Sequence, residues 1–213
     1  MTQSAASRVT KPREETLRKR EEILSAGLEV FGNRGYKNGS LAEIAEQVGM
    51  THAGVLHHFG SKDQLLLEVL LYRDRTDVEH IEGQHIPDNL ELFNHLIATA
   101  RKNEGRPGIV QAFAVLSAES VTDNHPAKAF FANRYANLRD EIRVALNAVC
   151  DKDDPPTDDA IEFATCGVIA VMDGLQIQWL LAPDVVKLAD SSAWAINALL
   201  SSAISGHTRR ILT

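Results

Sequence analysis

Cysteine is scarce in this sequence of 213 residues, which contains only Cys150 and Cys166. The two are too far apart for a CxxC unit and too few for a disulfide framework, so we expect small buried apolar residues in a reducing compartment. No window approaches the roughly 18 uninterrupted apolar residues of a membrane span, and residues 1–12 lack the apolar stretch of a signal peptide. These absences predict a cytoplasmic protein that does not enter a membrane.

Catalytic and metal-binding signatures are also missing. The sequence has no HExxH pair, no Gly-x-Ser-x-Gly turn and no phosphate-binding loop. His57 and His58 are adjacent, so they point in different directions from one helix. Asp123 and His125 flank an expected helix start, where such residues cap. We therefore expect no catalytic site, no metal site and no cofactor.

The alternating pattern of a half-buried strand is absent, whereas apolar residues recur at helical spacing throughout. Pro107 and Pro126 suit the first turn of a helix, where the missing N–H would be unpaired anyway. The long helices are expected at 14–33, 62–81, 89–102, 107–121, 126–149, 157–181 and 189–205, with two short ones between 40 and 60. The sequence predicts an all-α fold with a flexible basic arm (1–13), a small helical domain (14–60) and a larger helical domain (61–213).

Charge is unevenly distributed along the chain. The net charge is −7, but residues 1–62 contain nine Lys and Arg against seven Asp and Glu, which leaves −9 on the remainder. A basic segment ahead of an acidic one suggests two different tasks on one chain. Lys37 and the basic arm before Glu14 can add sequence-independent attraction to nucleic acid, or the arm is simply a solvated part of the surface.

Residues 40–62, SLAEIAEQVGMTHAGVLHHFGSK, indicate two short helices joined by a tight turn. Ser40 and Glu43 have the spacing of a capping box, and Thr51 caps the second helix. Ala45, Gly49 and Val55 supply the small contact residue, the turn glycine and the apolar anchor at the spacing of a DNA-binding helix-turn-helix. An ordinary corner between two helices of a bundle is the alternative interpretation.

The wider stretch from Leu17 to Leu66 resembles the N-terminal domain of the TetR family of transcriptional repressors. The resemblance covers about a quarter of the chain strongly, and it rests on Ile23-Leu24, Ala26, Val30-Phe31, Gly35-Tyr36, Ile44-Ala45, Gly49, His58-Phe59 and Ser61-Lys62. The family usually has tyrosine where this sequence has Leu56, and that tyrosine commonly touches the DNA backbone. His57 and His58 are the candidates to replace it.

The second short helix is expected to lie in the major groove of double-stranded operator DNA, with its first turn toward base edges. His52 can read a base edge, Ala53 and Gly54 allow close approach, and Lys62 is placed to hold a phosphate. His58 is either a phosphate contact or a structural histidine. The predicted DNA-binding residues are Lys37, Ser40, Thr51, His52, Ala53, Gly54, His57, His58 and Lys62.

The helix expected at 157–181 has two distinct faces. One is a stripe of mostly small residues: Ala160, Ala164, Gly167, Val171, Gly174 and Gln178. Small residues allow close helix packing, either against a second copy of the chain or against the last helix of the same chain. The family resemblance implies a homodimer through the last two helices, and two recognition helices about one DNA turn apart would read a palindrome.

The other face is bulky, and it is either plain core or the wall of a ligand cavity. The family resemblance implies an effector pocket between these helices. The predicted lining is Phe113, Leu116, Phe130, Phe131, Tyr135, Met172, Gln176 and Trp179, which favours a small, mainly apolar molecule. The sequence thus predicts a homodimeric repressor that such an effector releases from DNA. An enzyme and a purely structural interaction protein are the rival classes, and neither accounts for the helix-turn-helix pattern together with the division of charge.

Overall fold

The computed structural model describes residues 7–78 and 89–204, and this part of the chain forms nine helices and no strand. They are α1 (Ser7–Asn38), α2 (Leu41–Gln47), α3 (His52–Phe59), α4 (Lys62–Val78), α5 (Asn89–Glu104), α6 (Pro107–Glu119), α7 (Lys128–Val149), α8 (Asp158–Leu181) and α9 (Leu188–Ile204). The all-α prediction is confirmed. The expected continuation of α4 to residue 81 and of α9 to residue 205 lies outside the described residues.

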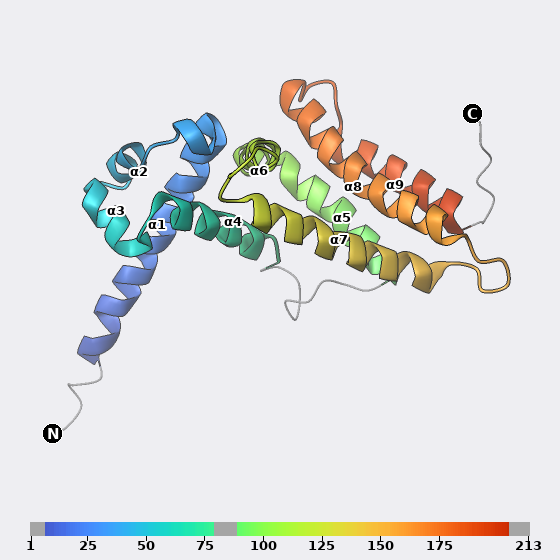
Figure 1. Ribbon diagram of the computed structural model, residues 1–213, viewed down its shortest axis with the longest axis horizontal. Helices are drawn as coiled ribbons and strands as arrows, with labels where there is room; N and C mark the ends of the chain where they lie inside the picture. Colours follow the sequence, from blue (N-terminus) through green and yellow to red (C-terminus); the bar gives the residue numbers. More distant parts are fainter. Residues whose placement is uncertain (1–6, 79–88, 205–213) are drawn as a thin grey trace.

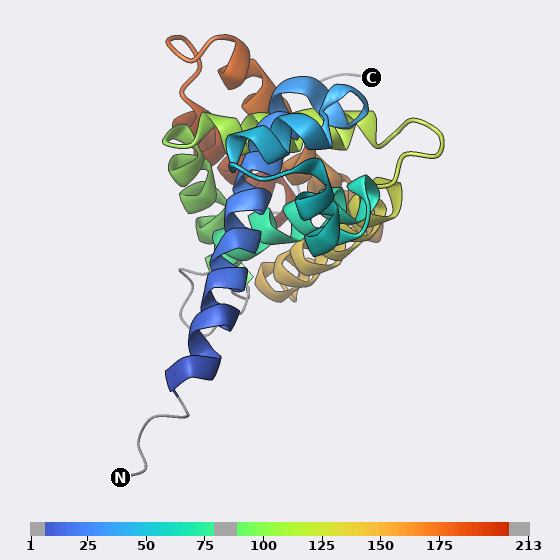
Figure 2. The same cartoon turned by 90° about the vertical axis from the view of Figure 1, so that its left-hand side faces the viewer.

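The helices form a smaller N-terminal group and a larger C-terminal group, which lie at opposite ends of the long axis (Figure 1). Helices α1 to α4 make the first group, and the N-terminal end of α1 projects away from the molecule in both views (Figures 1 and 2). Helices α5 and α7 to α9 run beside one another in the second group, while α6 lies between the groups and packs on α1 and α8.

Two helix starts differ from the sequence predictions. Helix α1 begins at Ser7, so residues 7–13 of the expected flexible arm are helical. Helix α7 begins at Lys128, and Pro126 lies in the preceding turn rather than in the first helical turn. Pro107, in contrast, occupies the first turn of α6 as expected. Gly35 has φ +70°, and this kink divides α1 into a long helix and one further turn. Glycine suits the position because a residue without a Cβ readily adopts a positive φ.

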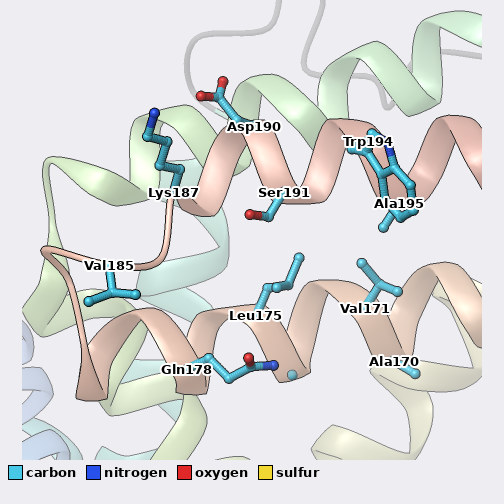
Figure 3. A pocket seen from close by; sticks show the side chains of 11 residues that line it. Ala170, Val171, Leu175, Gln178, Val185, Lys187, Asp190, Ser191, Trp194 and Ala195 are labelled. Atoms are coloured by element: carbon cyan, nitrogen blue, oxygen red, sulfur yellow. The ribbon is translucent and has the colours of Figure 1, made fainter.

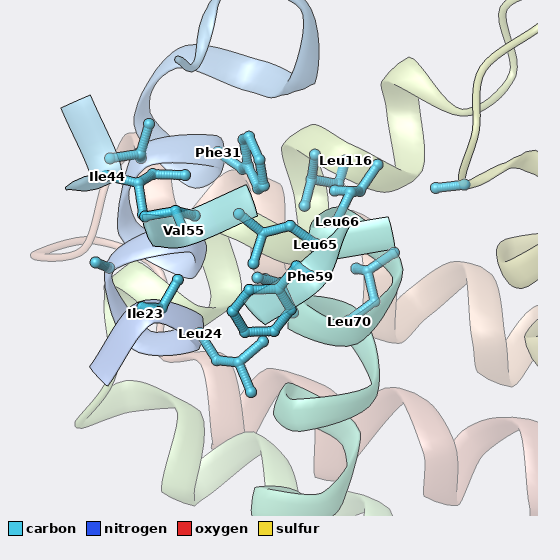
Figure 4. Close-up of a cluster of buried hydrophobic side chains, with 14 of the residues drawn as sticks. Ile23, Leu24, Phe31, Ile44, Val55, Phe59, Leu65, Leu66, Leu70 and Leu116 are labelled. Carbon is cyan, nitrogen blue, oxygen red and sulfur yellow. The ribbon is translucent and has the colours of Figure 1, made fainter. Parts of the chain in front are cut away.

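The N-terminal group has its own apolar core, drawn in Figure 4. Ile44 on α2 and Val55 and Phe59 on α3 pack against apolar residues of α1 and α4. The core contributions of α1 and α4 are Ile23, Leu24, Ala26, Val30, Phe31, Leu65, Leu66, Val69 and Leu70. Since α2 and α3 have only seven and eight residues, their stability depends on this packing rather than on helix propensity.

The same core continues into the larger group. Phe113 and Leu116 of α6 and Phe131 of α7 belong to the cluster that contains α1 and α4. Helix α4 therefore completes the core of the predicted small domain, although it follows the predicted boundary at 60/61. Movement of α6 or α4 cannot leave α1 unaffected, because close-packed side chains transmit displacement.

Helix α8 is long and apolar enough to span a membrane by length and composition alone. It is the core helix of this fold: Ile161, Val168 and Ile169 are buried against α5, α7 and α9. Asp173 interrupts its apolar run. Apolar residues on one face of α8 pack into the core, and those on its outer face are exposed, as described below.

Candidate DNA-binding surface and ligand cavity

The turn between α2 and α3 is built by two caps and one glycine. The Ser40 hydroxyl accepts the Glu43 N–H at 3.1 Å, and the Thr51 hydroxyl accepts the Gly54 N–H at 3.1 Å. Gly49 has φ +63°, and the next residue's N–H reaches the Ala45 carbonyl at 2.8 Å. In a capping box the Glu43 carboxylate would reach back to the Ser40 N–H. Here it lies 3.6 Å from the Arg34 guanidinium.

The first turn of α3 faces solvent. Thr51, His52, Ala53 and His57 are exposed, as are Lys37 and Ser40 at the end of α1 and the start of α2. Gly54, expected to be exposed, is half-buried, and a Cβ placed on it would lie 3.1 Å from the methyl group of Met50. A glycine at this position therefore keeps the turn and α3 in close contact.

His58 is half-buried beneath α3, and its surroundings are positively charged. Burial, followed by the charges of His57, Arg20 and Lys19, lowers the pKa of its imidazole. The side chain is therefore neutral at pH 7, which weakens it as an electrostatic phosphate contact but leaves its ring nitrogens available for hydrogen bonding.

Lys62 is half-buried beside the end of α1. Its ammonium group lies 4.5 Å from the centre of the Tyr36 ring and donates to the Lys37 carbonyl at 3.4 Å. Burial lowers its pKa, while Asp63 and Glu119 partly offset that effect. The lysine is thus held close to the exposed Lys37, next to the start of α2.

Lys19 and Arg20 have a role that the sequence prediction missed. The Lys19 ammonium donates to the Val48 carbonyl at 2.7 Å, at the end of α2. The Arg20 guanidinium donates to the His58 carbonyl, pairs with Glu68 and stacks on the Phe59 ring at 4.3 Å. These two cations of α1 therefore hold the helix-turn-helix in place. The sequence analysis assigned them no individual role, and their spacing along α1 gives no sign of these contacts.

A cavity of about 890 Å³ lies between α4, α5, α6, α7 and α8. Its apolar wall includes Leu96, Phe113, Phe130, Leu138 and Met172. Polar and charged side chains also line it: Gln64, Glu68, Arg73, Asp74, His95, Thr99, Asn103, Asn133, Arg134, Tyr135, Asn137, Glu141, Asp173 and Gln176. The volume suits a small organic molecule, and the lining offers it both apolar surface and ionic groups.

Two arginines and one aspartate form the ionic centre of this cavity. Asp74 of α4 accepts from Arg73 at 3.1 Å and from Arg134 of α7 at 2.9 Å. Both guanidiniums lie over the ring of Phe113, at 4.4 and 4.9 Å from its centre. The network joins α4, α6 and α7 at the wall of the cavity.

Sequence comparisons identify the class of protein that has this arrangement. Residues 23–69 match the model of bacterial regulatory proteins of the tetR family, and residues 92–202, just over half of the chain, match the BetI-type transcriptional repressor C-terminal domain. The chain belongs to the TetR family of transcriptional regulators. TetR-family regulators bind operator DNA as dimers and are not enzymes.

Individual relatives extend over most of this TetR-family chain. It is 31% identical over 198 residues to the HTH-type transcriptional regulator BetI of Rhizobium meliloti, covering 90% of each chain. It is 25% identical over 203 residues to TtgR of Pseudomonas putida, covering 90% of this chain and 94% of TtgR. SmeT, the repressor of the Stenotrophomonas maltophilia multidrug efflux pump SmeDEF, shares the fold with a TM-score of 0.68 at 17% identity, covering 87% of this chain and 90% of SmeT.

The predicted ligand residues of this TetR-family chain fall into two groups. Phe113, Phe130, Tyr135, Met172 and Gln176 line the cavity. The other three do not: Leu116 and Phe131 are buried in the N-terminal core, and Trp179, only 7% exposed, packs with Ala100, Val110 and Leu188. The charged residues of the lining were missed, because no local pattern separates an inward-facing charge from a solvated one.

The outer face of α8 and α9 exposes large apolar side chains. Phe163 is 71% exposed and Trp194 is 76% exposed, and Ile177 and Leu181 continue the same face. A groove of about 750 Å³ separates the C-terminal half of α8 from the N-terminal half of α9, with Val171, Leu175, Ser191 and Ala195 pointing into it (Figure 3). A Cβ on Gly174 would meet nothing within 4 Å, whereas one on Gly167 would touch Leu199. Of the two alternatives for the small-residue stripe, Gly167 fits the internal contact and Gly174 faces open space.

The two cysteines are less buried than expected. Cys150 is half-buried and Cys166 is exposed on α8. Within residues 7–78 and 89–204 no group of three or more His, Cys, Asp and Glu is arranged to hold a metal ion.

Proposed function

We propose that this chain is a cytoplasmic repressor that binds a palindromic operator as a homodimer and releases it when a small molecule enters the cavity. The observation that carries the proposal is the composition of the cavity wall: Arg73 and Asp74 lie on α4, the helix whose first half completes the DNA-binding core. A ligand in the cavity therefore touches the helix that supports α2 and α3.

DNA recognition is assigned to α3 and its flanks. His52, Ala53 and His57 face outward from α3 and would contact base edges. Ser40 and Thr51 cap α2 and α3, and Gly54 lies close to Met50 of the turn. Lys37 and Lys62 lie beside α2 and would hold phosphates, as would a ring nitrogen of His58.

Dimerisation is assigned to the outer face of α8 and α9. Exposed large apolar residues in one continuous face are costly in water, and a second copy packed across a two-fold axis would cover them on both subunits. Trp194 has the size and exposure of an interface anchor, and Gly174 leaves space for an incoming side chain.

A second route connects the cavity to the DNA-binding surface through α6. Phe113 lines the cavity, and six residues later the Glu119 carboxylate accepts the Tyr36 N–H at 2.7 Å. Tyr36 in turn donates to Asp63 and carries Lys62 on its ring. Gly35 lies against this carboxylate, where a Cβ would clash. A shift of α6 on ligand binding would therefore move the end of α1 next to Lys37, and a ligand that prefers one arrangement would change operator affinity accordingly.

Selection of bound fragments from random double-stranded DNA tests the proposal. We expect the bound pool to converge on a palindrome whose half-sites are about one helical turn apart. A pool that does not converge, or that converges on a single half-site without two-fold symmetry, would contradict it.

A further inference from the structure

The carboxylate of Asp173 lines the cavity and is half-buried. Its Oδ2 accepts the hydroxyl of Tyr135 at 2.7 Å, and among the described residues this is its one hydrogen bond. A carboxylate has room for about four donors, so most of its hydrogen-bonding capacity is unused. Burial raises the pKa of Asp173, while the Tyr135 hydrogen bond and the charges of Arg134 and Arg73 act in the opposite direction. Among the described protein groups, Tyr135 is therefore the one hydrogen-bond donor to this carboxylate.

The arginines do not complete this carboxylate, because they are engaged elsewhere. Asp74 bridges the guanidiniums of Arg73 and Arg134, and both guanidiniums lie against Phe113. Their charges reach Asp173 through space without a hydrogen bond.

Among the described residues the cavity is lined by the carboxylates of Glu68, Asp74, Glu141 and Asp173 and by two arginines, and Glu68 is paired with Arg20 of α1.

We propose that the cavity binds an organic amine whose protonated nitrogen donates to Asp173 and whose apolar body lies along Phe130, Leu138 and Met172. The inference rests on the proposed function, and it names the chemical class of the effector. An N–H donor meets the remaining oxygen lone pairs of the carboxylate, and a charge-assisted hydrogen bond is stronger than a neutral one. The proposed ligand is thus cationic at one end, whereas the sequence predicts a mainly apolar molecule.

Three probes with one carbon skeleton test the inference: 4-phenylbutylamine, 4-phenylbutan-1-ol and 4-phenylbutyrate. Each is titrated calorimetrically into the full-length protein at pH 7.5. We expect the amine to bind at least about tenfold more tightly than the alcohol, and the acid to bind most weakly. Equal affinity for amine and alcohol, tightest binding of the acid, or no binding of any probe would overturn the inference.

Substitutions at Asp173 test whether this residue causes the preference for the amine. Asp173→Asn should bring the amine down to the affinity of the alcohol and leave the alcohol unchanged, whereas Asp173→Glu should retain a preference for the amine. Asp140→Asn is the matched control, because Asp140 lies on α7 with a 63% exposed side chain and does not line the cavity. Retention of the full amine preference in Asp173→Asn would overturn the assignment. The order of the three probes on the wild-type protein remains decisive if a variant folds poorly.

Duplex binding measured in the same samples separates this inference from the proposed function. Amine binding without release of duplex DNA would support the site and contradict ligand-controlled repression. Duplex binding with no response to any probe in calorimetry would overturn the amine site alone.

Discussion

The DNA-binding surface and the ligand cavity are built in different ways. The surface comes from residues 37–62, a continuous stretch whose turn is closed by caps three residues apart. The cavity takes side chains from positions 64 to 176 on five helices, and its main ion pair joins Asp74 to Arg134, sixty residues away. The first depends on local chemistry, and the second depends on how helices pack. Changes in the two regions should therefore have separable consequences.

The largest expected effect is on the packed core beside the cavity. Trp179→Ala should lower the free energy of unfolding by about 3 to 5 kcal/mol, because the indole is buried against Ala100, Val110 and Leu188. Urea denaturation measures the loss. Val144→Ala is the control, since this apolar side chain on α7 is 63% exposed and lies outside both the cavity lining and the proposed dimer face. A Trp179 variant that is as stable as the wild type but responds more weakly to ligand would indicate that this residue lines the cavity instead.

The next effect tests the proposed dimer face. Gly174→Leu should leave the fold of one chain intact, because nothing lies within 4 Å of the position that its Cβ would take. In the dimer the added side chain is expected to cost about 1 to 3 kcal/mol at each of two symmetric positions. Sedimentation should then show a shift toward monomer. An unchanged dimer would place the interface elsewhere, as would a wild-type protein that is monomeric at micromolar concentration.

A smaller effect concerns the connection between cavity and surface. Glu119→Gln removes the charge that accepts the Tyr36 N–H, and a hydrogen bond to a charged group contributes about 1.5 to 3 kcal/mol. We expect weaker operator binding together with a reduced response to ligand, measured by fluorescence anisotropy on labelled operator. Glu29→Gln, an exposed change on α1, is the control. Wild-type response in the Glu119 variant would remove α6 from the coupling route.

Within the DNA-binding surface, His52 and Lys62 should contribute to DNA binding in different ways. His52→Ala should cost about 1 to 3 kcal/mol on operator and relax the preference at one base pair per half-site. Lys62→Ala should weaken binding to all duplexes and reduce the salt slope by about one for each phosphate that the lysine neutralises. Binding isotherms on operator and random DNA at several salt concentrations distinguish the two. Equal losses on both DNAs for both variants would contradict the division of roles.

The smallest effect is a pH dependence inside the cavity. Burial raises the native-state pKa of Asp173 above its unfolded value, so its ionised form destabilises the fold above the native pKa. This cost disappears as pH falls through the native pKa toward the unfolded one. Asp173→Asn should therefore raise the melting temperature at pH 8, and the gain should shrink in acid. A gain that is constant with pH would show that the charge of Asp173 is not its cause.

The sequence predicted the features that depend on residues close together in the chain. Ser40, Gly49 and Thr51 indicated the turn because each acts on backbone groups within a few residues. It could not predict that Lys19 and Arg20 turn toward α2 and α3, because their partners lie 29 to 48 residues along the chain.

The cavity could be predicted only in part for the same reason: its lining residues are far apart in the sequence. Aromatic and methionine spacing identified four lining residues, and Gln176 was predicted with them, but the spacing could not distinguish Phe130 from its neighbour Phe131, which is buried in the core. Asp74 and Arg134 looked like ordinary surface charges on two separate helices. Only packing brings them together, so the ionic character of the cavity appears with the tertiary structure.

The central claim is that α2 and α3 of two subunits together read one operator. The most direct measurement is a titration of the purified protein against the selected palindrome, a single half-site and a scrambled duplex at physiological salt. The palindrome should bind about 10³-fold or more tightly than the scrambled duplex, one dimer to each site, with the half-site well below it. Equal affinity for all three duplexes would contradict the claim.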